Sequence, residues 1–279
     1  MSYKILELYK KNGFVEFDNL FTENQISKWN SLLDTHYEGK KEKHNIDLLE
    51  LGEPGFNIVK EFFNDKIRFI SCALIKDPIL FYAGSNEIPS EQKVSHVNHN
   101  EIEGWHTDTG EELQYLDMRM PYWITFFVYL TNVDNDDGAF EISNIVKKKQ
   151  ISHNTECFKM TGKKGKCFLW GNPFYHRASP NIGTNRRRIL KIQIQHNYLE
   201  NSYLDKLKKN HKFLENEDNF LKYIFGSKHF GTYRDWKMEQ SIIEQNIDII
   251  EHIYNKDSNS RIKLKYLNSL KKRFKDIFA

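Results

Sequence analysis

The sequence predicts a mainly β protein with flanking helices, in which a jelly roll or barrel forms the core. From residue 78 onward, short β-prone runs follow one another: ILFYAGSNE, KVSHVNHNE, YWITFFVYLTNV, GAFEIS, GKCFLWG and RRILKIQIQHNY. Turn residues separate these runs, as in NDDG at 135–138 and GNP at 171–173. Helical segments do not alternate with the strands, which argues against a parallel sheet and favours an antiparallel jelly roll.

Residues 1–77 are expected to support this core with helices and strands. A helix is predicted over residues 2–11 and ends at Asn12-Gly13, and FVEF then alternates as a strand does. Thr22 and Gln25 have the spacing of a capping box, which predicts a helix through about Asp34. Residues 36–55 are polar, with scattered glycines, and predict a loop. The segment FNIVKEFFNDKIRFISCALI then has the apolar spacing of one or two helices.

The chain after about residue 201 again has apolar residues at helical spacing, in YLDKLKKNHKFLENEDNFLKYIF and two later segments. No linker rich in Pro, Gly or Ser precedes this region. We therefore expect a single domain over residues 1–279. It comprises the N-terminal support (1–77), a jelly-roll core (78–200) and a C-terminal helical extension (201–279).

The composition limits the class of partner. The 41 basic and 38 acidic residues nearly balance, so no strong field for nucleic acid or a membrane surface is expected. The N-terminus has no apolar run typical of a signal peptide, and no stretch suits a membrane span. Three cysteines without metal-site spacing favour a reducing, cytoplasmic setting. The sequence does not predict the oligomeric state.

The stretch GWHTDTG at 104–110 is the first candidate for chemistry. Residues i and i+2 of a strand point to the same side, so His106 and Asp108 can reach one ion. Two histidines and one carboxylate on one face of an ion form the site of non-haem Fe(II) oxygenases, which leaves positions open for co-substrate and O2. His99 and Glu101 form a rival pair, but their polar surroundings favour His106 and Asp108.

A third ligand must come from a distant strand. His176 follows a predicted strand and turn, 70 residues after His106. An antiparallel fold can return it to the same end of the sheet. Arg187 lies 11 residues after His176, at the start of another strand. Its guanidinium could bind a carboxylate bidentately, as a dicarboxylate co-substrate such as 2-oxoglutarate requires. The alternatives without a catalytic role are that His176 is a histidine in a turn and that Arg187 is a surface charge.

Taken in order, GWHTD, VYLTNVDNDDGAFEI and HRASPN…RRRIL resemble the motifs of the phytanoyl-CoA dioxygenase family of Fe(II)/2-oxoglutarate oxygenases. The N-terminal NGFVEFDNLFTENQISKW is also similar, so the resemblance covers roughly residues 8–198. It implies a double-stranded β-helix (a cupin-like jelly roll). It also implies Fe(II) ligands His106, Asp108 and His176, with 2-oxoglutarate and O2 as co-substrates.

The resemblance implies further roles around the iron. Arg187 would bind the far carboxylate of 2-oxoglutarate, although Arg186 and Arg188 are rivals; the 11-residue offset and strand alternation favour Arg187. Three more residues would lie at the co-substrate or the pocket wall: Thr107, Asn98 and Phe127. The sequence departs from the family after GAFEI, where it reads SNIVKKK, and at Ala178, where many relatives have serine.

The implied activity is hydroxylation of a small molecule at a C–H bond, with release of succinate and CO2. Asp108 favours hydroxylation over halogenation, because related halogenases have a small residue at the carboxylate position. Desaturation, ring closure and epimerisation stay open, as does the identity of the substrate. Two other readings are a macromolecule-modifying oxygenase, hinted at by the lysine run at 147–149, and a non-catalytic jelly-roll binding protein.

Overall fold

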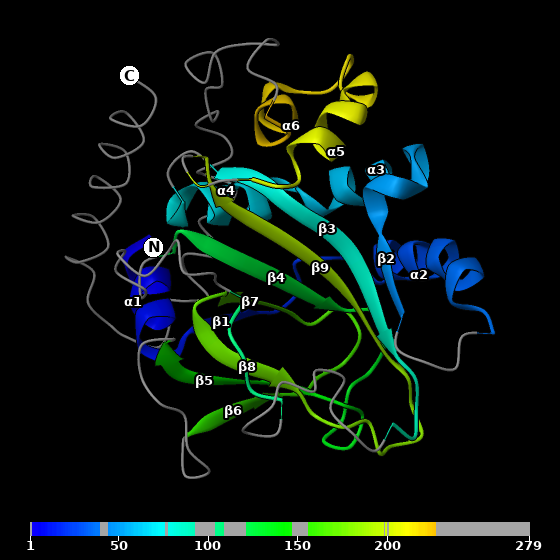
Figure 1. Ribbon diagram of the computed structural model, residues 1–279, viewed down its shortest axis with the longest axis vertical. Helices are drawn as coiled ribbons and strands as arrows, with labels where there is room; N and C mark the ends of the chain where they lie inside the picture. The colour runs from blue at the N-terminus through cyan, green and yellow to red at the C-terminus, as the bar shows by residue number, and fades with distance from the viewer. Residues whose placement is uncertain are drawn as a thin grey trace.

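The chain forms two antiparallel sheets that face each other, with helices on the outer side of the larger one (Figure 1). The computed structural model describes residues 2–39, 44–75, 78–92, 104–108, 121–146, 156–197, 199 and 201–226. The large sheet has the strand order β1-β7-β4-β9-β3-β2, and the small sheet has the order β6-β5-β8. This is the predicted mainly β, jelly-roll architecture.

The strands of the large sheet are β1 (Phe14–Phe17), β2 (His44–Asp47), β3 (Pro78–Ile88), β4 (Trp123–Tyr129), β7 (Cys167–Gly171) and β9 (Arg187–His196). Those of the small sheet are β5 (Phe140–Val146), β6 (Cys157–Met160) and β8 (Phe174–Ala178). Neighbouring strands pair antiparallel throughout.

The large sheet is buried on both faces, which explains the nearly continuous apolar runs in its strands. On β4, the Phe126 ring contacts Phe62 of a covering helix, with ring centroids 5.6 Å apart. The next side chain, Phe127, points the other way and contacts Phe140 of the small sheet at 5.0 Å. Successive residues of one strand thus build two separate layers of core.

The N-terminal third supplies the helices α1 (Ser2–Asn12), α2 (Glu23–Tyr37), α3 (Glu53–Phe62) and α4 (Asp65–Leu74). The predicted capping box is confirmed, because the Thr22 hydroxyl accepts from the Gln25 backbone while the Gln25 side chain accepts from the Thr22 backbone. The apolar segment after residue 55 forms two helices. Together α2 and α3 cover the outer face of the large sheet.

The loop predicted over residues 36–55 is wrong for most of its length. Within it lie the end of α2, strand β2 and a 3-10 helix, η1 (Leu48–Leu51), before α3 begins at Glu53. β2 has four residues, too few for an alternating pattern to be visible. Tertiary contacts define it instead, since Asn45 and Ile46 pair with Asn86 and Ser85 at the end of β3.

The C-terminal part described here is helical, as its apolar spacing predicts, with α5 (Leu204–Lys209), η3 (His211–Phe213) and α6 (Asn219–Ile224). Asn201 anchors it to β3, because its Nδ2 donates to the Leu80 carbonyl at 3.0 Å. Lys206 and Tyr203 both bind Asp47 of β2. In the described part of the chain, no helix is long and apolar enough to cross a membrane.

Candidate active site

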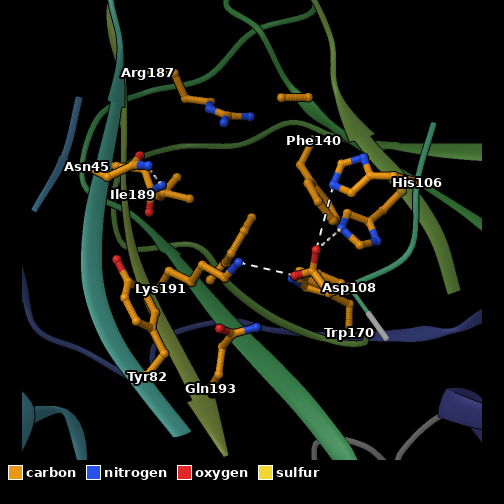
Figure 2. Close-up of a pocket in the computed structure, with 14 residues that line it drawn as sticks. Asn45, Tyr82, His106, Asp108, Phe140, Trp170, Arg187, Ile189, Lys191 and Gln193 are labelled. Carbon is orange, nitrogen blue, oxygen red and sulfur yellow. Dashed lines mark hydrogen bonds and ion pairs between the residues drawn. The ribbon is translucent and has the colours of Figure 1, made fainter. Parts of the chain in front are cut away.

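His106, Asp108 and His176 converge at one end of the space between the sheets (Figure 2). Each offers a ligand atom, and these atoms all lie within 4.8 Å of one another. The backbone brings the two histidines together: the His106 N–H donates to the His176 carbonyl at 3.1 Å, and the His176 N–H donates back at 2.9 Å. The chain separation of 70 residues is therefore closed by one antiparallel bridge.

Both imidazoles are oriented by their backbones. Nδ1 of His106 bonds to the Gly104 carbonyl at 2.9 Å, and Nδ1 of His176 bonds to the Phe174 carbonyl at 2.8 Å. A carbonyl can only accept, so Nδ1 carries the proton in each ring and Nε2 keeps its lone pair. Each Nε2 faces Oδ1 of Asp108, at 3.7 Å from His106 and 3.5 Å from His176.

The protonation states suit a divalent metal. Burial, and after it the neighbouring His176, lower the pKa of His106 to about 4. Burial alone would raise the pKa of Asp108, but the Lys191 ammonium and the two imidazoles hold that pKa well below its usual value. Near neutral pH, His106 is a neutral donor and Asp108 a carboxylate, which are the forms that bind metal.

Several contacts hold the segment 104–108 in place. Gly104 has a φ of +85°, a left-handed conformation that favours glycine. The Asp108 N–H donates to the Asn172 carbonyl at 3.1 Å. On the outer side of the small sheet, the Arg177 guanidinium lies over the Trp105 ring at 4.8 Å. The Arg177 Nε donates to Glu141 at 2.6 Å, which fixes that cation in turn.

The cavity beside these residues has a volume of about 400 Å³. It is lined by residues of both sheets: Asn45, Tyr82, Asn86, His106, Asp108, Phe127, Phe140, Trp170, His176, Ala178, Arg187, Ile189, Lys191 and Gln193. Trp170 packs on His176, with ring centroids 4.0 Å apart. A space of this size, with few charged groups and an aromatic wall, is typical of a small-molecule site.

Arg187 lies across the cavity from the histidines (Figure 2). It is 3% exposed, and one guanidinium N–H donates to the Gly138 carbonyl at 2.6 Å. Its Nε has no hydrogen-bond partner, and within the described part of the chain no carboxylate pairs with it. Burial lowers the pKa of Arg187, because the charge is desolvated. A buried cation without a counter-ion is a place for an anionic ligand.

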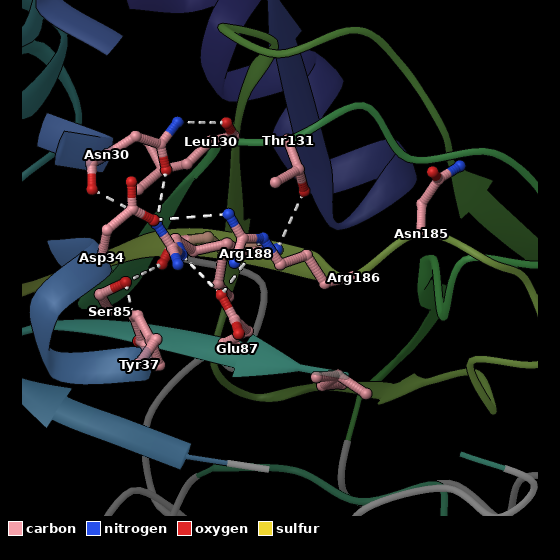
Figure 3. A network of polar contacts seen from close by, with 12 residues as sticks. Asn30, Asp34, Tyr37, Ser85, Glu87, Leu130, Thr131, Asn185, Arg186 and Arg188 are labelled. Atoms are coloured by element: carbon pink, nitrogen blue, oxygen red, sulfur yellow. Dashed lines mark hydrogen bonds and ion pairs between the residues drawn. The ribbon is translucent and has the colours of Figure 1, made fainter. Parts of the chain in front are cut away.

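Its two rivals have other surroundings. Arg186 has a half-exposed side chain and lies 3.4 Å from Asp34. Arg188 points to the helix-covered face of the sheet and is held in a polar network (Figure 3). Its Nε donates to Glu87 at 2.7 Å, and another N–H donates to Asp34 at 2.8 Å. Only Arg187 of these three lines the cavity.

The other predicted residues divide. Phe127 lines the cavity, and so does Ala178, the residue that replaces serine. Thr107 is half-buried and is not among the cavity-lining side chains. Asn98 and the rival pair His99 and Glu101 lie outside the described residues, as does the lysine run at 147–149.

Sequence reasoning missed Lys191, which reaches the candidate metal ligand Asp108. Its Nζ lies 3.3 Å from Oδ2 of Asp108 and 5.9 Å from the centre of the Trp170 ring. Gln193, further along the same strand, was also missed. Strand alternation from Arg187 could have indicated both, because residues i+2, i+4 and i+6 share its face.

Known structures have the same fold. HygX from Streptomyces hygroscopicus with nickel and 2-oxoglutarate bound aligns with a TM-score of 0.55 and 13% identity, over 71% of this chain and 88% of that one. The epimerase SnoN from nogalamycin biosynthesis, described as non-heme and alpha-ketoglutarate dependent, aligns with a TM-score of 0.53 and 12% identity, over 70% and 83%. The carbocyclase SnoK of the same pathway gives 0.53 and 15%, over 70% and 84%.

These likenesses define the class of fold: the cupin-like jelly roll that these non-haem iron enzymes also have. Neither the comparison with protein-family models nor that with curated proteins finds a match. The phytanoyl-CoA dioxygenase resemblance therefore stays a prediction.

Proposed function

We propose that this protein is an Fe(II)/2-oxoglutarate-dependent oxygenase that acts on a small molecule. The observation that carries the proposal is the convergence of His106, Asp108 and His176 within 4.8 Å, in one cavity with a buried arginine that pairs with no carboxylate of the described residues. SnoN in complex with Fe3+ and alpha-ketoglutarate, and HygX with iron, support the cofactor assignment through their shared fold.

The donor set fits iron. Two neutral imidazoles and one carboxylate leave the remaining positions of an octahedral ion open. When bound, Fe(II) with 2-oxoglutarate supplies the oxidising power for reaction with O2 at a C–H bond, with release of succinate and CO2. Arg187 would bind the far carboxylate of 2-oxoglutarate through its guanidinium, whose Nε has no hydrogen-bond partner, and this would set the co-substrate's direction in the cavity. Phe127 and Trp170, whose rings lie next to each other beside His176, exclude water from the candidate metal end of the cavity.

Hydroxylation is the reaction we propose, since Asp108 occupies the carboxylate position. The likeness to an epimerase and a carbocyclase is a likeness of fold alone, and it leaves those outcomes as alternatives that product analysis separates. A macromolecular substrate is the second alternative. Nogalamycin RO in a SnoN structure and hygromycin B in a HygX structure show that the fold accepts small molecules, which favours a small substrate here.

The test is anaerobic. Fe(II) and then 2-oxoglutarate are added to metal-free protein, and the visible charge-transfer absorbance is recorded. We expect a band that requires both additions, followed by succinate release once O2 is admitted. A folded, metal-loaded protein without this band would contradict the proposal and favour a non-catalytic binding protein. Mass spectrometry of the product, with a gain of one oxygen atom, then separates hydroxylation from epimerisation and desaturation.

A further inference from the structure

Strand β9 places a second cation in the cavity that the proposed reaction does not use. Four alternate side chains of this strand line the space: Arg187, Ile189, Lys191 and Gln193. Arg187 and Lys191 are four residues apart, so their backbones are about 13 Å apart along the strand. A single carboxylate or phosphate is too small to bind the Arg187 guanidinium and the Lys191 ammonium at the same time.

The charges of the loaded cavity do not balance. Among its lining residues, only Arg187, Lys191 and Asp108 carry charge, given neutral histidines. The dication and the 2-oxoglutarate dianion cancel, and Arg187 and Asp108 cancel as well. The ammonium of Lys191 then leaves a net single positive charge in a half-enclosed space. A buried charge that is not balanced is costly, so an anionic ligand group is favoured there.

The present partner of Lys191 is a weak one for the loaded state. Its Nζ lies 3.3 Å from Oδ2 of Asp108, at the long end for a charged hydrogen bond. Coordination of Asp108 to a divalent ion withdraws the negative charge that attracts the ammonium. The Lys191 side chain is 21% exposed, and its four-carbon stem is flexible, so the head can turn toward a ligand.

A second hydrogen-bond donor, Tyr82, lies on the neighbouring strand β3. Gly84 of β3 pairs with Lys191 of β9, and Tyr82 pairs with Gln193. A Cβ at Gly84 would lie 2.1 Å from the Tyr82 hydroxyl oxygen, so the phenol occupies the space that glycine leaves open. The Tyr82 ring therefore lies beside the Lys191 stem on the same wall of the cavity, while the Lys191 ammonium points toward Asp108 (Figure 2).

The Tyr82 hydroxyl is a neutral donor, because burial, and after it the Asp47 carboxylate, raise the pKa of Tyr82 to about 12. It makes no hydrogen bond to any described residue of the chain. Lys191 and Tyr82 occupy diagonal positions on two paired strands. Once the Lys191 head turns from Asp108, its ammonium and the Tyr82 phenol form a pair of donors for one anionic group.

We propose that Lys191 and Tyr82 bind an anionic group of the substrate, a carboxylate or a phosphate, and thereby present its C–H bonds to the iron site. This inference rests on the proposed function and adds the chemical class of the substrate. Arg187 serves the co-substrate at one end of β9, and Lys191 serves the substrate nearer the metal ligands.

The experiment uses the full chain loaded anaerobically with Fe(II) and 2-oxoglutarate. Matched pairs of probes are titrated: phenylacetate against phenylacetamide, gluconate against glucose, and glycerol 3-phosphate against glycerol. Line broadening of the probe's NMR signals by the paramagnetic iron reports binding near the metal. We expect the anionic member of at least one pair to bind about 10-fold more tightly, as a charge-assisted hydrogen bond predicts. The anionic probe that binds most tightly shows whether the site prefers a carboxylate or a phosphate.

Variants separate the roles. Lys191→Gln should reduce anion binding to the level of the neutral probe, whereas Lys191→Arg and the exposed-site control Lys163→Gln should retain it. Tyr82→Phe should lower the affinity for the anionic probe by about 5-fold, as loss of one hydrogen bond predicts. In Lys191→Gln, the affinity for 2-oxoglutarate should stay within about 3-fold of wild type, whereas Arg187→Gln should weaken it by about 10-fold or more.

Three results would overturn the inference. The first is equal binding of anionic and neutral probes. The second is full retention of anion binding in Lys191→Gln. The third is a loss of 2-oxoglutarate affinity in Lys191→Gln as large as in Arg187→Gln, which would assign the lysine to the co-substrate. A wild-type protein without the 2-oxoglutarate band would instead contradict the proposed function itself, and the inference with it.

Discussion

Arg187 and Arg188 are neighbours in sequence and equally buried, at 3% and 0% exposure, yet their surroundings are opposite. Arg188 lies on the helix side of the large sheet, where Glu87 and Asp34 balance its charge and Tyr37 stacks beneath it at 4.6 Å. Arg187 lies on the cavity side, where no described carboxylate pairs with it. Buried charge alone therefore does not identify a functional residue; what matters is whether the fold supplies the counter-charge.

β8 repeats this division. His176 points to the cavity and joins the candidate metal ligands, whereas Arg177 points outward and pairs with Glu141 at 2.6 Å. In both strands the inward side chain faces the cavity, whereas the outward side chain pairs with a carboxylate within the fold. The inward residues should therefore govern binding and the outward ones stability.

The largest effect should come from an inward residue. His176→Ala removes one candidate metal ligand, so we expect loss of the Fe(II)- and 2-oxoglutarate-dependent absorbance. The loss of metal affinity should exceed the 10–100-fold typical of outer-shell changes around a metal. The measurement is the anaerobic titration, with the exposed His36→Ala as control. An unchanged band in His176→Ala would break the assignment of the cavity face to the metal.

The outward arginine should give the largest loss of stability. Arg188→Met leaves the buried Glu87 with only the longer contact to Arg186, at 3.8 Å, so we expect the free energy of unfolding to fall by about 3–5 kcal/mol. Arg187→Met removes a cation that has no internal counter-charge, and should change it by less than about 1 kcal/mol or raise it. Urea denaturation followed by circular dichroism measures both.

A compensating change makes this test sharper. Arg188→Met combined with Glu87→Leu removes both charges and should recover much of the lost stability, because buried ion pairs are often replaceable by apolar residues. Equal destabilisation by Arg187→Met and Arg188→Met would show that the two arginines do not differ as proposed.

The inward arginine should also be sensitive to shape. Arg187→Lys keeps the charge but loses the planar fork that binds a carboxylate bidentately. We expect the 2-oxoglutarate dissociation constant to rise about 10–150-fold, as loss of a charged hydrogen bond worth about 1.5–3 kcal/mol predicts. Anaerobic titration of the charge-transfer band measures it. Arg186→Lys, on the exposed side chain, is the matched control and should leave the constant unchanged.

Much of the fold and part of the site could be predicted because the signals are local. The apolar, β-prone runs of β4 and β9, the turn residues between strands, and the capping box at Thr22 need no tertiary information. The pair His106 and Asp108 is local as well. β2 could not be predicted, since its four residues become a strand only by pairing with β3.

Lys191 and Tyr82 show a different limit. Each lies in a predicted strand, but their proximity depends on the β3–β9 register, which places Gly84 opposite Lys191. No feature of either strand alone fixes that register. The distinction between Arg187 and Arg188 is similar: alternation predicts that they face opposite ways, but only the packed helix α2 shows which side already holds carboxylates.

The smallest effect should come from the contact between Trp105 and Arg177, which lies outside the cavity. Trp105 precedes the candidate ligand His106 in sequence, and Arg177 follows the candidate ligand His176. Trp105→Leu removes a cation–π contact worth about 0.5–2 kcal/mol, so Fe(II) affinity should fall by about 2–30-fold as the His106 segment loses its support. Arg177→Met should cause at least a similar loss, because it also removes the ion pair with Glu141. The double variant should lose little more than Arg177→Met alone, because both single changes break the same cation–π contact. Competition with a metal-sensitive dye measures the affinities. Strictly additive losses of Fe(II) affinity would mean that the two residues act separately. Arg177 would then affect metal binding by some means other than its contact with Trp105.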